Sequence, residues 1–422
     1  MNFPNSLAED CEIAGSLTTV DKTLQKLLKE QQINPRPLMV CSGGTSTRCA
    51  MEGHWTLDLR KCCQELVFNP QEAVIELGAG HTMKTLLKEL LLYHRSFPIG
   101  LSDQTGMGYI LTGGISPLSR SQGIAVDQIL EINGIWGSGQ NFVISRPNVT
   151  ASYLEKRQWK ALSGAAPYLG IITKIKLKTF PIKPLCVWKS EVNKEELSEI
   201  IQHAEQWPFS ISLQWTWGEI ITTYVVSTNP KDELINTLKK VFKGFKEINQ
   251  EEIYEISGLH QLPSFSQTNF EPNKYKNRIH SEVLGLLGPE WRGSCNEIIT
   301  SLSQLIKERP HPNCQISSQQ LGGFNHHSKE SSYSFIDINS MWKPWITASW
   351  TRRDFRTRKE SFLWLEKVWD TLKPHCPGVH MAQMHQHLDW HERELELAFG
   401  DWLPKLQELK TIYDPNGLLP PL

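Results

Sequence analysis

The first 180 residues alternate between helical and strand-like patterns of apolar side chains. Apolar residues spaced three and four apart predict one amphipathic helix behind a cap at Thr18 or Thr19, and a second over residues 83–91. The two stripes consist of Val20, Leu24, Leu27 and Leu28, and of Met83, Leu86, Leu87, Leu90 and Leu91. Short apolar runs predict strands at 38–41, 55–59 and 73–77. We therefore expect a mixed α+β domain whose helix stripes face its core.

A second region follows a proline-containing break. Residues 171–180 alternate apolar side chains and threonine with lysine, which predicts a strand with one solvated face, and the run Pro181 to Pro184 ends it. Predicted strands (211–217, 345–350) and amphipathic helices (234–245, 298–306, 362–372) then alternate. This order predicts an antiparallel sheet covered by helices. Residues 255–293 show little periodicity and are interpreted either as a lid or as a long surface loop.

Composition narrows the class of protein. The 422 residues contain 44 Lys and Arg against 45 Asp and Glu, so no excess of positive charge favours a nucleic acid partner. Neither a signal-peptide pattern at the start nor a run of about 20 apolar residues is present, which predicts a soluble protein without a membrane partner. The nine cysteines lack Cys-x-x-Cys spacing and predict reduced thiols in a cytoplasm.

Three segments suggest binding of a dinucleotide. They are Cys41-Ser-Gly-Gly-Thr-Ser46, Thr105-Gly-Met-Gly-Tyr-Ile-Leu-Thr-Gly-Gly114 and Ser163-Gly-Ala-Ala-Pro-Tyr-Leu-Gly-Ile-Ile-Thr173. A buried pyrophosphate needs main-chain N–H groups directed at it, and glycine lets the chain approach without a Cβ in the way. Neither glycine loop matches the Gly-x-Gly-x-x-Gly fingerprint or the P-loop, so the common nucleotide-binding folds fit poorly.

The order of these segments resembles the FAD-linked oxidase superfamily that includes vanillyl-alcohol oxidase, and within it the berberine-bridge-enzyme-like branch. Further runs resemble motifs of the same family: Gln122 to Asp127, Trp159 to Gly164, Met384 to Asp389, Phe399 to Leu406 and Lys410 to Asn416. The resemblance implies an α+β fold. It consists of a two-part PCMH-type FAD-binding domain at 1–184 and 376–422, with a substrate domain at 185–375 whose antiparallel sheet is covered by helices.

The resemblance also implies which residues hold FAD. Carried over motif by motif, they are Ser42, Gly43, Gly44, Thr45, Ser46, Ser102, Thr105, Gly106, Gly108, Thr112, Gly113, Gly114, Gly123, Gly170, Ile172 and Gln386. Relatives often attach the flavin through a histidine at the position of Thr45 and a cysteine at the position of Ser102. Neither residue present here can form those links, so we expect FAD to be bound noncovalently.

The position of the catalytic base departs from the family as well. Gln319 occupies the place of a frequent glutamate, and an amide can orient a substrate but has no useful basicity. Met384 replaces a tyrosine that is often active in relatives. His385, in the run that resembles a strand beside the flavin, is the preferred candidate base, because imidazole titrates near neutrality. His326 and His327 are interpreted as solvated loop residues.

Several other residues have two possible interpretations. His387 and His391 have the spacing of a helical zinc pair, but no Cys or carboxylate completes a set, so no metal is predicted. Cys41 and Cys49 are interpreted as packing residues rather than as a nucleophile. The tryptophans of the predicted substrate-domain strands either pack the core or line an aromatic pocket; they are Trp215, Trp217, Trp345 and Trp350.

Together these features predict an FAD-dependent oxidoreductase. We expect it to oxidise a small, apolar or aromatic specialised metabolite by hydride transfer to flavin N5, with oxygen or another acceptor reoxidising the cofactor. One alternative is a flavin-retaining cyclase or binding scaffold that performs no net oxidation. Another is a sugar-acid or lactone dehydrogenase, which would prefer hydroxyl-rich ligands. The sequence does not indicate an oligomeric state.

Overall fold

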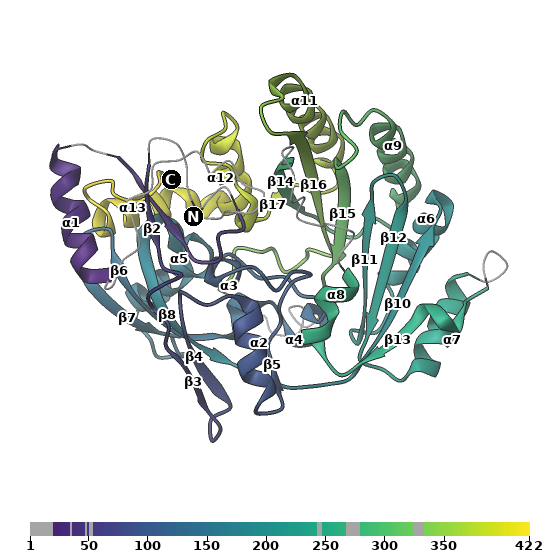
Figure 1. The fold of residues 1–422 in the computed structure, drawn as a ribbon, viewed down its shortest axis with the longest axis horizontal. Helices are drawn as coiled ribbons and strands as arrows, with labels where there is room; N and C mark the ends of the chain where they lie inside the picture. Colours follow the sequence, from purple (N-terminus) through teal and green to yellow (C-terminus); the bar gives the residue numbers. More distant parts are fainter. Residues whose placement is uncertain are drawn as a thin grey trace.

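Two antiparallel sheets, each with its own helices, form the two halves of the molecule (Figure 1). The structure is a computed structural model, and it describes residues 20–33, 36–46, 49, 54–242, 247–266, 279–323 and 333–422. His326 and His327 lie outside the described residues.

The first half is built around a five-stranded sheet with the strand order β3-β4-β8-β6-β7. Its strands are β3 (Leu66–Asn69), β4 (Val74–Gly78), β6 (Ile129–Trp136), β7 (Asn141–Ser145) and β8 (Gly170–Lys178). Two small sheets accompany it: parallel β1 (Leu38–Cys41) and β2 (Trp55–Asp58), and antiparallel β5 (Arg95–Ser96) and β9 (Phe180–Pro181). The helical elements are α1 (Val20–Ile33), α2 (Met83–Leu91), α3 (Met107–Leu111), α4 (Ser119–Gln122), η3 (Ala125–Gln128) and α5 (Tyr153–Leu169).

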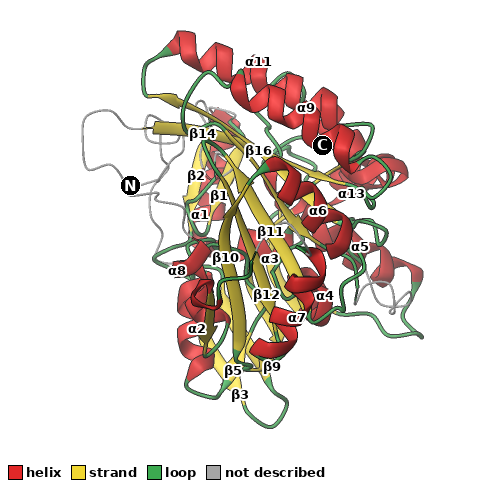
Figure 2. Cartoon of the chain, turned by 90° about the vertical axis from the view of Figure 1, so that its right-hand side faces the viewer, coloured by secondary structure: helices red, strands yellow, loops and turns green. Residues whose placement is uncertain are grey.

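The second half contains an eight-stranded sheet with the order β13-β10-β12-β11-β15-β16-β14-β17. Its strands are β10 (Leu185–Val192), β11 (Ile211–Trp217), β12 (Ile221–Ser227), β13 (Ile253–Ile256), β14 (Ile279–Leu287), β15 (Gln315–Gln320), β16 (Trp342–Thr351) and β17 (Gly378–Val379). The accompanying helical elements are α6 (Lys194–Ala204), α7 (Lys231–Val241), η4 (Gln250–Glu252), η5 (Leu259–Gln261), α8 (Leu262–Ser266), α9 (Cys295–Lys307) and α11 (Phe355–Leu372). Figure 2 shows α6, α7, α9 and α11 lying over one face of this sheet, which leaves the opposite face to the first half.

The C-terminal segment returns to the first half. It contains η6 (Met381–Gln383), α12 (His391–Phe399), η7 (Gly400–Trp402) and α13 (Leu403–Tyr413), drawn in yellow in Figure 1. Lys410 Nζ donates to the carbonyl oxygen of Tyr168 on α5 at 2.9 Å, and the N–H of Leu38 on β1 donates to the carbonyl oxygen of Leu418 at 2.7 Å. These bonds anchor the end of the chain beside the first glycine loop.

Local sequence explains the boundaries of several elements. Helix α2 begins where Thr82 accepts a hydrogen bond from the N–H of Thr85, and it buries Met83, Leu86, Leu87 and Leu90, as the spacing predicts. The proline-containing break lies between β9, which ends at Pro181, and β10, which begins at Leu185.

One expectation about the second half is wrong. Residues 279–287, interpreted as part of a lid or long loop, form strand β14 inside the eight-stranded sheet. The alternation that marks a half-buried strand is absent from the sequence because His280 and Glu282 are buried polar side chains, 3% and 2% exposed.

Candidate active site

The two glycine loops contact each other through their backbones. Strand β1 runs directly into the first loop, where Ser42 Oγ donates to the carbonyl oxygen of Ala79 at 2.6 Å and accepts from the N–H of Met107 at 2.9 Å. A Cβ on Gly43 would lie 2.3 Å from the nitrogen of Gly106, and a Cβ on Gly106 would lie 2.3 Å from the nitrogen of Gly43. Only glycine permits this approach, so the two loops form one continuous backbone surface.

A cavity of about 430 Å³ opens over this surface. Most of the residues expected to hold the cofactor line it: Ser42, Gly43, Gly44, Thr45, Ser46, Ser102, Thr105, Gly106, Gly108, Thr112, Gly170, Ile172 and Gln386. Segments that are separated by more than 300 residues in the chain therefore meet at one site, as the resemblance implies.

Three of the expected cofactor residues do not line the cavity. Gly113, Gly114 and Gly123 all adopt positive φ angles, of 123°, 69° and 81°. Gly114 lies against Ala125, and the N–H of Gly123 donates to the carbonyl oxygen of Ser119 at 2.9 Å, at the end of α4. These glycines shape the turns beside the cavity, because their conformations are strained for other residues.

Unpartnered polar atoms mark the places where a bound dinucleotide would make hydrogen bonds. Within the described residues, Thr105 Oγ1 and Gln386 Oε1 are buried on the cavity lining without a hydrogen-bond partner. Buried polar atoms are normally paired, so both atoms are suited to a ligand. Together with the main-chain amides of the glycine loops, they fit the polar atoms of FAD. Thr45 and Ser102, which the resemblance assigns to the flavin-attachment positions, also line the cavity.

The eight-stranded sheet supplies the opposite wall. Strands β14, β15 and β16 contribute Ser281, Val283, Gln319, Lys343 and Trp345 to the lining. Gln319 on β15 is directly opposite Lys343 on β16, so both side chains are on the same face of the sheet. Within the described residues, Gln319 Nε2 has no hydrogen-bond partner, which leaves it available to a substrate.

Lys343 was missed by the sequence analysis. Its side chain is 6% exposed, its Nζ lies 4.3 Å from the centre of the Trp345 ring, and burial lowers its pKa to about 7. The available signal was a lone lysine inside the aromatic and β-branched run Trp342–Thr351. Of the four tryptophans with two interpretations, Trp345 lines the cavity. Trp215 packs edge-to-face against Trp291 in the core, and the buried Trp350 packs between His280 of β14 and Phe362 of α11.

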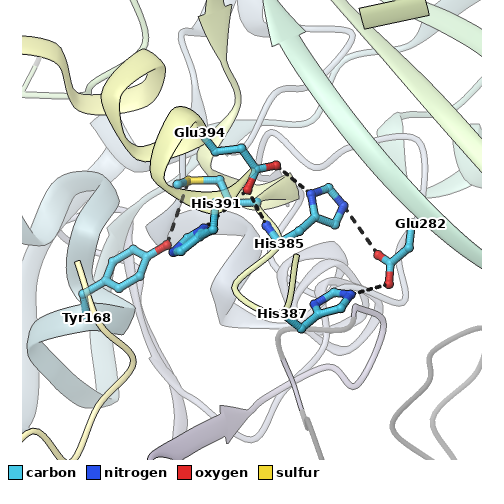
Figure 3. Close-up of polar contacts among 7 residues, drawn as sticks. Tyr168, Glu282, His385, His387, His391 and Glu394 are labelled. Carbon is cyan, nitrogen blue, oxygen red and sulfur yellow. Dashed lines mark hydrogen bonds and ion pairs between the residues drawn. The ribbon is translucent and has the colours of Figure 1, made fainter. Parts of the chain in front are cut away.

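A buried network of histidines and glutamates adjoins the cavity (Figure 3). His385, 2% exposed, lies between two carboxylates: its Nδ1 is 2.6 Å from Glu394 Oε1, and its Nε2 is 3.5 Å from Glu282 Oε2. His387 Nε2 lies 2.9 Å from Glu282 Oε1, and His391 Nδ1 lies 3.4 Å from Glu394 Oε2. Both ring nitrogens of His385 therefore face protein carboxylates, although the residue lines the cavity.

The electrostatics of this network explain how a buried carboxylate stays ionised. Burial raises the pKa of Glu394, but the charge of His385 and hydrogen bonds from His385 and His391 outweigh burial and lower that pKa to about 2. Glu394 also accepts from the N–H of His385 at 2.7 Å, so it fixes both the ring and the backbone of that residue. The expectation that 384–389 form a strand is wrong, because 384 and 385 have no regular structure, 386–390 form turns and a bend, and α12 begins at His391.

Other predicted features are placed as follows. Within the described ranges, no group of three or more His, Cys, Asp or Glu side chains is arranged to hold a metal ion. Cys41 and Cys49 are buried, and Cys49 lines the cavity beside the first loop. In the part of the chain that the structure describes, no helix has both the length and the apolar character to cross a bilayer.

The sequence of this chain is similar to a known family and to two curated proteins. Residues 18–144 match the family model described as an FAD binding domain. The chain is 20% identical to an uncharacterized FAD-linked oxidoreductase, YgaK, of Bacillus subtilis, over 85% of this chain and 80% of that protein. It is 24% identical to an FAD-linked oxidoreductase of Dictyostelium discoideum, over 81% of this chain and 72% of the relative.

Solved structures show the same fold at low sequence identity. The structure of BBE-like 1 from Physcomitrella patens superposes with a TM-score of 0.79 at 17% identity, covering 99% of this chain and 92% of the other. A xylooligosaccharide oxidase from Myceliophthora thermophila C1, in complex with xylobiose, superposes with a TM-score of 0.78 at 16% identity, covering 99% and 93%. The predicted α+β fold class, with its helices and antiparallel sheets, is confirmed.

Proposed function

This chain belongs to the FAD-linked oxidoreductases and has the berberine-bridge-enzyme-like fold, and from that premise we propose that it holds FAD noncovalently and oxidises a small, apolar or aromatic substrate. The bound flavin supplies a hydride acceptor at N5, and oxygen or another acceptor reoxidises it. The protein binds and orients the substrate between the cofactor and the eight-stranded sheet, and it removes a proton.

The observation that carries this proposal is the two-sided cavity. Glycine-loop amides and the unpartnered Thr105 Oγ1 form the side suited to a dinucleotide. Gln319, Lys343 and Trp345 form the side suited to a substrate with one polar group and an apolar body, because the aromatic ring offers a flat apolar surface next to a donor and an amine. A substrate held there would lie against the face of the sheet that the helices leave uncovered.

Noncovalent attachment is supported by Thr45 and Ser102, since neither side chain can form a histidyl or cysteinyl link. The visible spectrum of the purified protein, followed by acid precipitation, tests it. We expect a yellow protein that gives a yellow supernatant and a colourless pellet. A yellow pellet would contradict the noncovalent attachment but not the binding of FAD. A colourless protein that takes up no added FAD would contradict the assignment of the cavity.

A flavin-retaining cyclase or scaffold remains the second candidate, because Gln319 and Met384 stand where relatives carry a glutamate and a tyrosine. Anaerobic mixing with candidate substrates separates the two. Loss of the flavin absorbance supports oxidation, whereas product formation with an unchanged flavin spectrum supports the alternative.

Hydroxyl-rich substrates form the third candidate class. The cavity lining contains the amides Gln319, Gln383 and Gln386 beside Trp345, and one protein of similar fold is named as an oxidase of xylooligosaccharides. Parallel anaerobic assays with aromatic alcohols, aldonic acids and lactones, and xylooligosaccharides decide between the classes. We expect aromatic alcohols to reduce the flavin fastest. A preference for the sugars would replace the substrate class that we propose but leave the reaction type in place.

A further inference from the structure

Lys343 occupies an unusual position for a lysine. It projects from β16, a strand inside the eight-stranded sheet, onto the cavity, and it is 6% exposed. At the cavity surface it lies against the Trp345 ring, two residues along the same strand, and directly opposite Gln319 on β15. A lysine at such a position would normally extend its amine to water or to a carboxylate.

No such partner is present among the described residues. In the part of the chain that the structure describes, the Lys343 amine has no hydrogen bond or ion pair and contacts the ring of Trp345. The other titratable side chains on the cavity lining are Glu282 from β14, His380 and His385 from the C-terminal segment, Tyr109 from α3, and Cys49. None of them forms an ion pair with Lys343, and burial is the cause that lowers its pKa to about 7. An unpaired buried ammonium is expensive, so the neutral amine is accessible near neutral pH.

We propose that Lys343 is the catalytic base of the oxidation: it accepts the hydroxyl proton of an alcohol whose oxygen also accepts a hydrogen bond from Gln319 Nε2. This inference rests on the proposed function and names its substrate class, a small alcohol with an apolar or aromatic body against Trp345. The facing register of Lys343 and Gln319 allows both to reach one substrate oxygen, since opposite Cβ atoms are about 5 Å apart.

The reaction balances without a further reactant. The O–H bond of the alcohol breaks, its proton moves to Lys343 Nζ, and its electron pair forms the second bond of the carbonyl. The C–H bond breaks at the same time, and its electron pair leaves with the hydrogen as hydride, which reduces the cofactor by two electrons. The products are an aldehyde or ketone and a lysine ammonium, which later returns its proton to water.

His385, the base that the sequence analysis preferred, is less suited to this role. Both of its ring nitrogens face carboxylates, at 2.6 Å from Glu394 and at 3.5 Å from Glu282. Glu282 is in turn held by the rings of His385 and His387. A base needs a lone pair directed at the substrate proton, and the carboxylates occupy both nitrogens of His385. His385 is therefore a positioning residue for this wall of the cavity.

The first test measures the charge of the amine and needs no substrate. Trace acetic anhydride reacts only with unprotonated amines, so the acetylation of each lysine peptide, followed by mass spectrometry across a pH series, gives the midpoint of its titration. We expect a midpoint near 7 for Lys343. Lys160 is the matched control: burial lowers its pKa to about 8, its Nζ donates to the carbonyl oxygen of Ser334, and it is not on the cavity lining. Adding FAD should reduce acetylation of Lys343 and leave that of Lys160 unchanged. A Lys343 midpoint near the ordinary lysine value of about 10.4 would overturn the proposal.

The second test measures the role of the amine. The holoenzyme is mixed anaerobically with 4-methoxybenzyl alcohol, cyclohexanol and 1-hexanol, and flavin bleaching is followed across a pH series. For the wild type, we expect the bleaching rate to rise with pH and to level off above about 7, where Lys343 is neutral. Lys343→Met and Lys343→Arg should both bleach about 10² to 10⁴-fold more slowly above pH 7, and the Met variant should lose the rise. Lys160→Met should behave as the wild type.

The outcomes separate this inference from the proposed function. Retained FAD absorbance shows that each Lys343 variant is folded and loaded. If the flavin of either Lys343 variant bleaches as fast as that of the wild type, the role of Lys343 is overturned, but the proposed oxidation is not. If Glu282→Gln, and not the Lys343 variants, loses the pH dependence of the bleaching rate, the role of Lys343 is also overturned, and the base is assigned to the network of histidines and glutamates. Wild-type flavin that no alcohol bleaches would overturn the proposed reaction and this inference together.

Discussion

Replacement of Glu394 by glutamine tests the network that surrounds His385. The substitution keeps the size of the side chain and one carbonyl-type acceptor, and it removes the negative charge. In the folded protein the Glu394 carboxylate accepts hydrogen bonds from the ring and the backbone N–H of His385 and from the ring of His391. The side chain is fully buried, so no water can take its place.

The expected loss of stability follows from the pKa of Glu394. It lies at about 2 in the folded protein against an ordinary glutamate pKa of 4.5, which corresponds to about 3 kcal/mol of unfolding free energy at neutral pH. Removing one partner of a buried ion pair costs about 3–5 kcal/mol, which agrees. Because the folded pKa is the lower one, the unfolded chain binds more protons between these two values. The stabilisation is therefore complete above about pH 4.5 and is lost as the pH falls toward 2, with about 1 kcal/mol left at pH 3.

Urea denaturation at about pH 7, 5 and 3 measures this dependence, with tryptophan fluorescence as the signal. Trp390 reports on the network, because its ring lies edge-to-face with His385 at 6.0 Å. Glu308→Gln is the matched control. Glu308 is a solvent-exposed glutamate whose hydrogen bond with Lys367 lowers its pKa, and its loss should leave the midpoint unchanged.

Two results would refute the reasoning. One is a Glu394→Gln protein that is as stable as the wild type at pH 7, which would mean that the buried carboxylate is replaceable by a neutral amide. The other is a stability loss of the same size at pH 7 and pH 3, which would assign the effect to packing or lost hydrogen bonds rather than to charge.

Three further predictions follow from buried contacts. Gly43→Ala should weaken FAD binding by more than about tenfold in a flavin fluorescence titration, because its Cβ would lie 2.3 Å from the facing loop. The control Gly293→Ala, whose Cβ meets open space, should bind FAD normally. Equal affinity of the two variants for FAD would contradict the backbone contact. Arg120→Met should lower the unfolding free energy by about 2 kcal/mol, since the guanidinium donates to the carbonyl oxygens of Ala204 and Trp207 in the other half of the molecule, and an unchanged urea midpoint would contradict this clamp. Lys343→Met should stabilise the fold by roughly 4 kcal/mol at pH 7, because the folded pKa of about 7 lies below the ordinary lysine pKa of 10.5. This gain should vanish in thermal melts as the pH rises toward 10.5, and a variant no more stable than the wild type at pH 7 would contradict the buried amine.

Periodicity and glycine placement predict much of this molecule because they reflect local rules. Four of the five residues in the predicted stripe of α2 are buried, and the fifth, Leu91, is exposed at the end of the helix. The glycines of two distant loops meet because only they allow a backbone separation of this kind. The site residues that were missed share another property. Glu282, Lys343 and Glu394 are charged side chains buried by tertiary contacts. Lys343 has a local signal, its place inside the aromatic and β-branched run of β16, whereas no local pattern marks the two glutamates as buried. For β14, the buried polar residues His280 and Glu282 concealed the strand itself.

With Lys343 as the proposed base, the chain would not need the glutamate that the resemblance places at Gln319. Neighbouring strands of a sheet are separated by about 5 Å, and a lysine side chain is longer than that of a glutamate. A base can therefore move from β15 to the facing residue of β16 while the substrate oxygen stays in place. Gln319 then supplies a hydrogen-bond donor at the facing position of β15. A carboxylate at that position would instead form an ion pair with Lys343 and keep the lysine charged. On this reasoning Gln319 and Lys343 act as a pair, and Gln319→Glu should raise the pKa of Lys343 and remove its activity as a base near neutral pH. Acetylation of Lys343 in this variant would measure the change, and a midpoint that stayed near 7 would show that the two side chains do not interact.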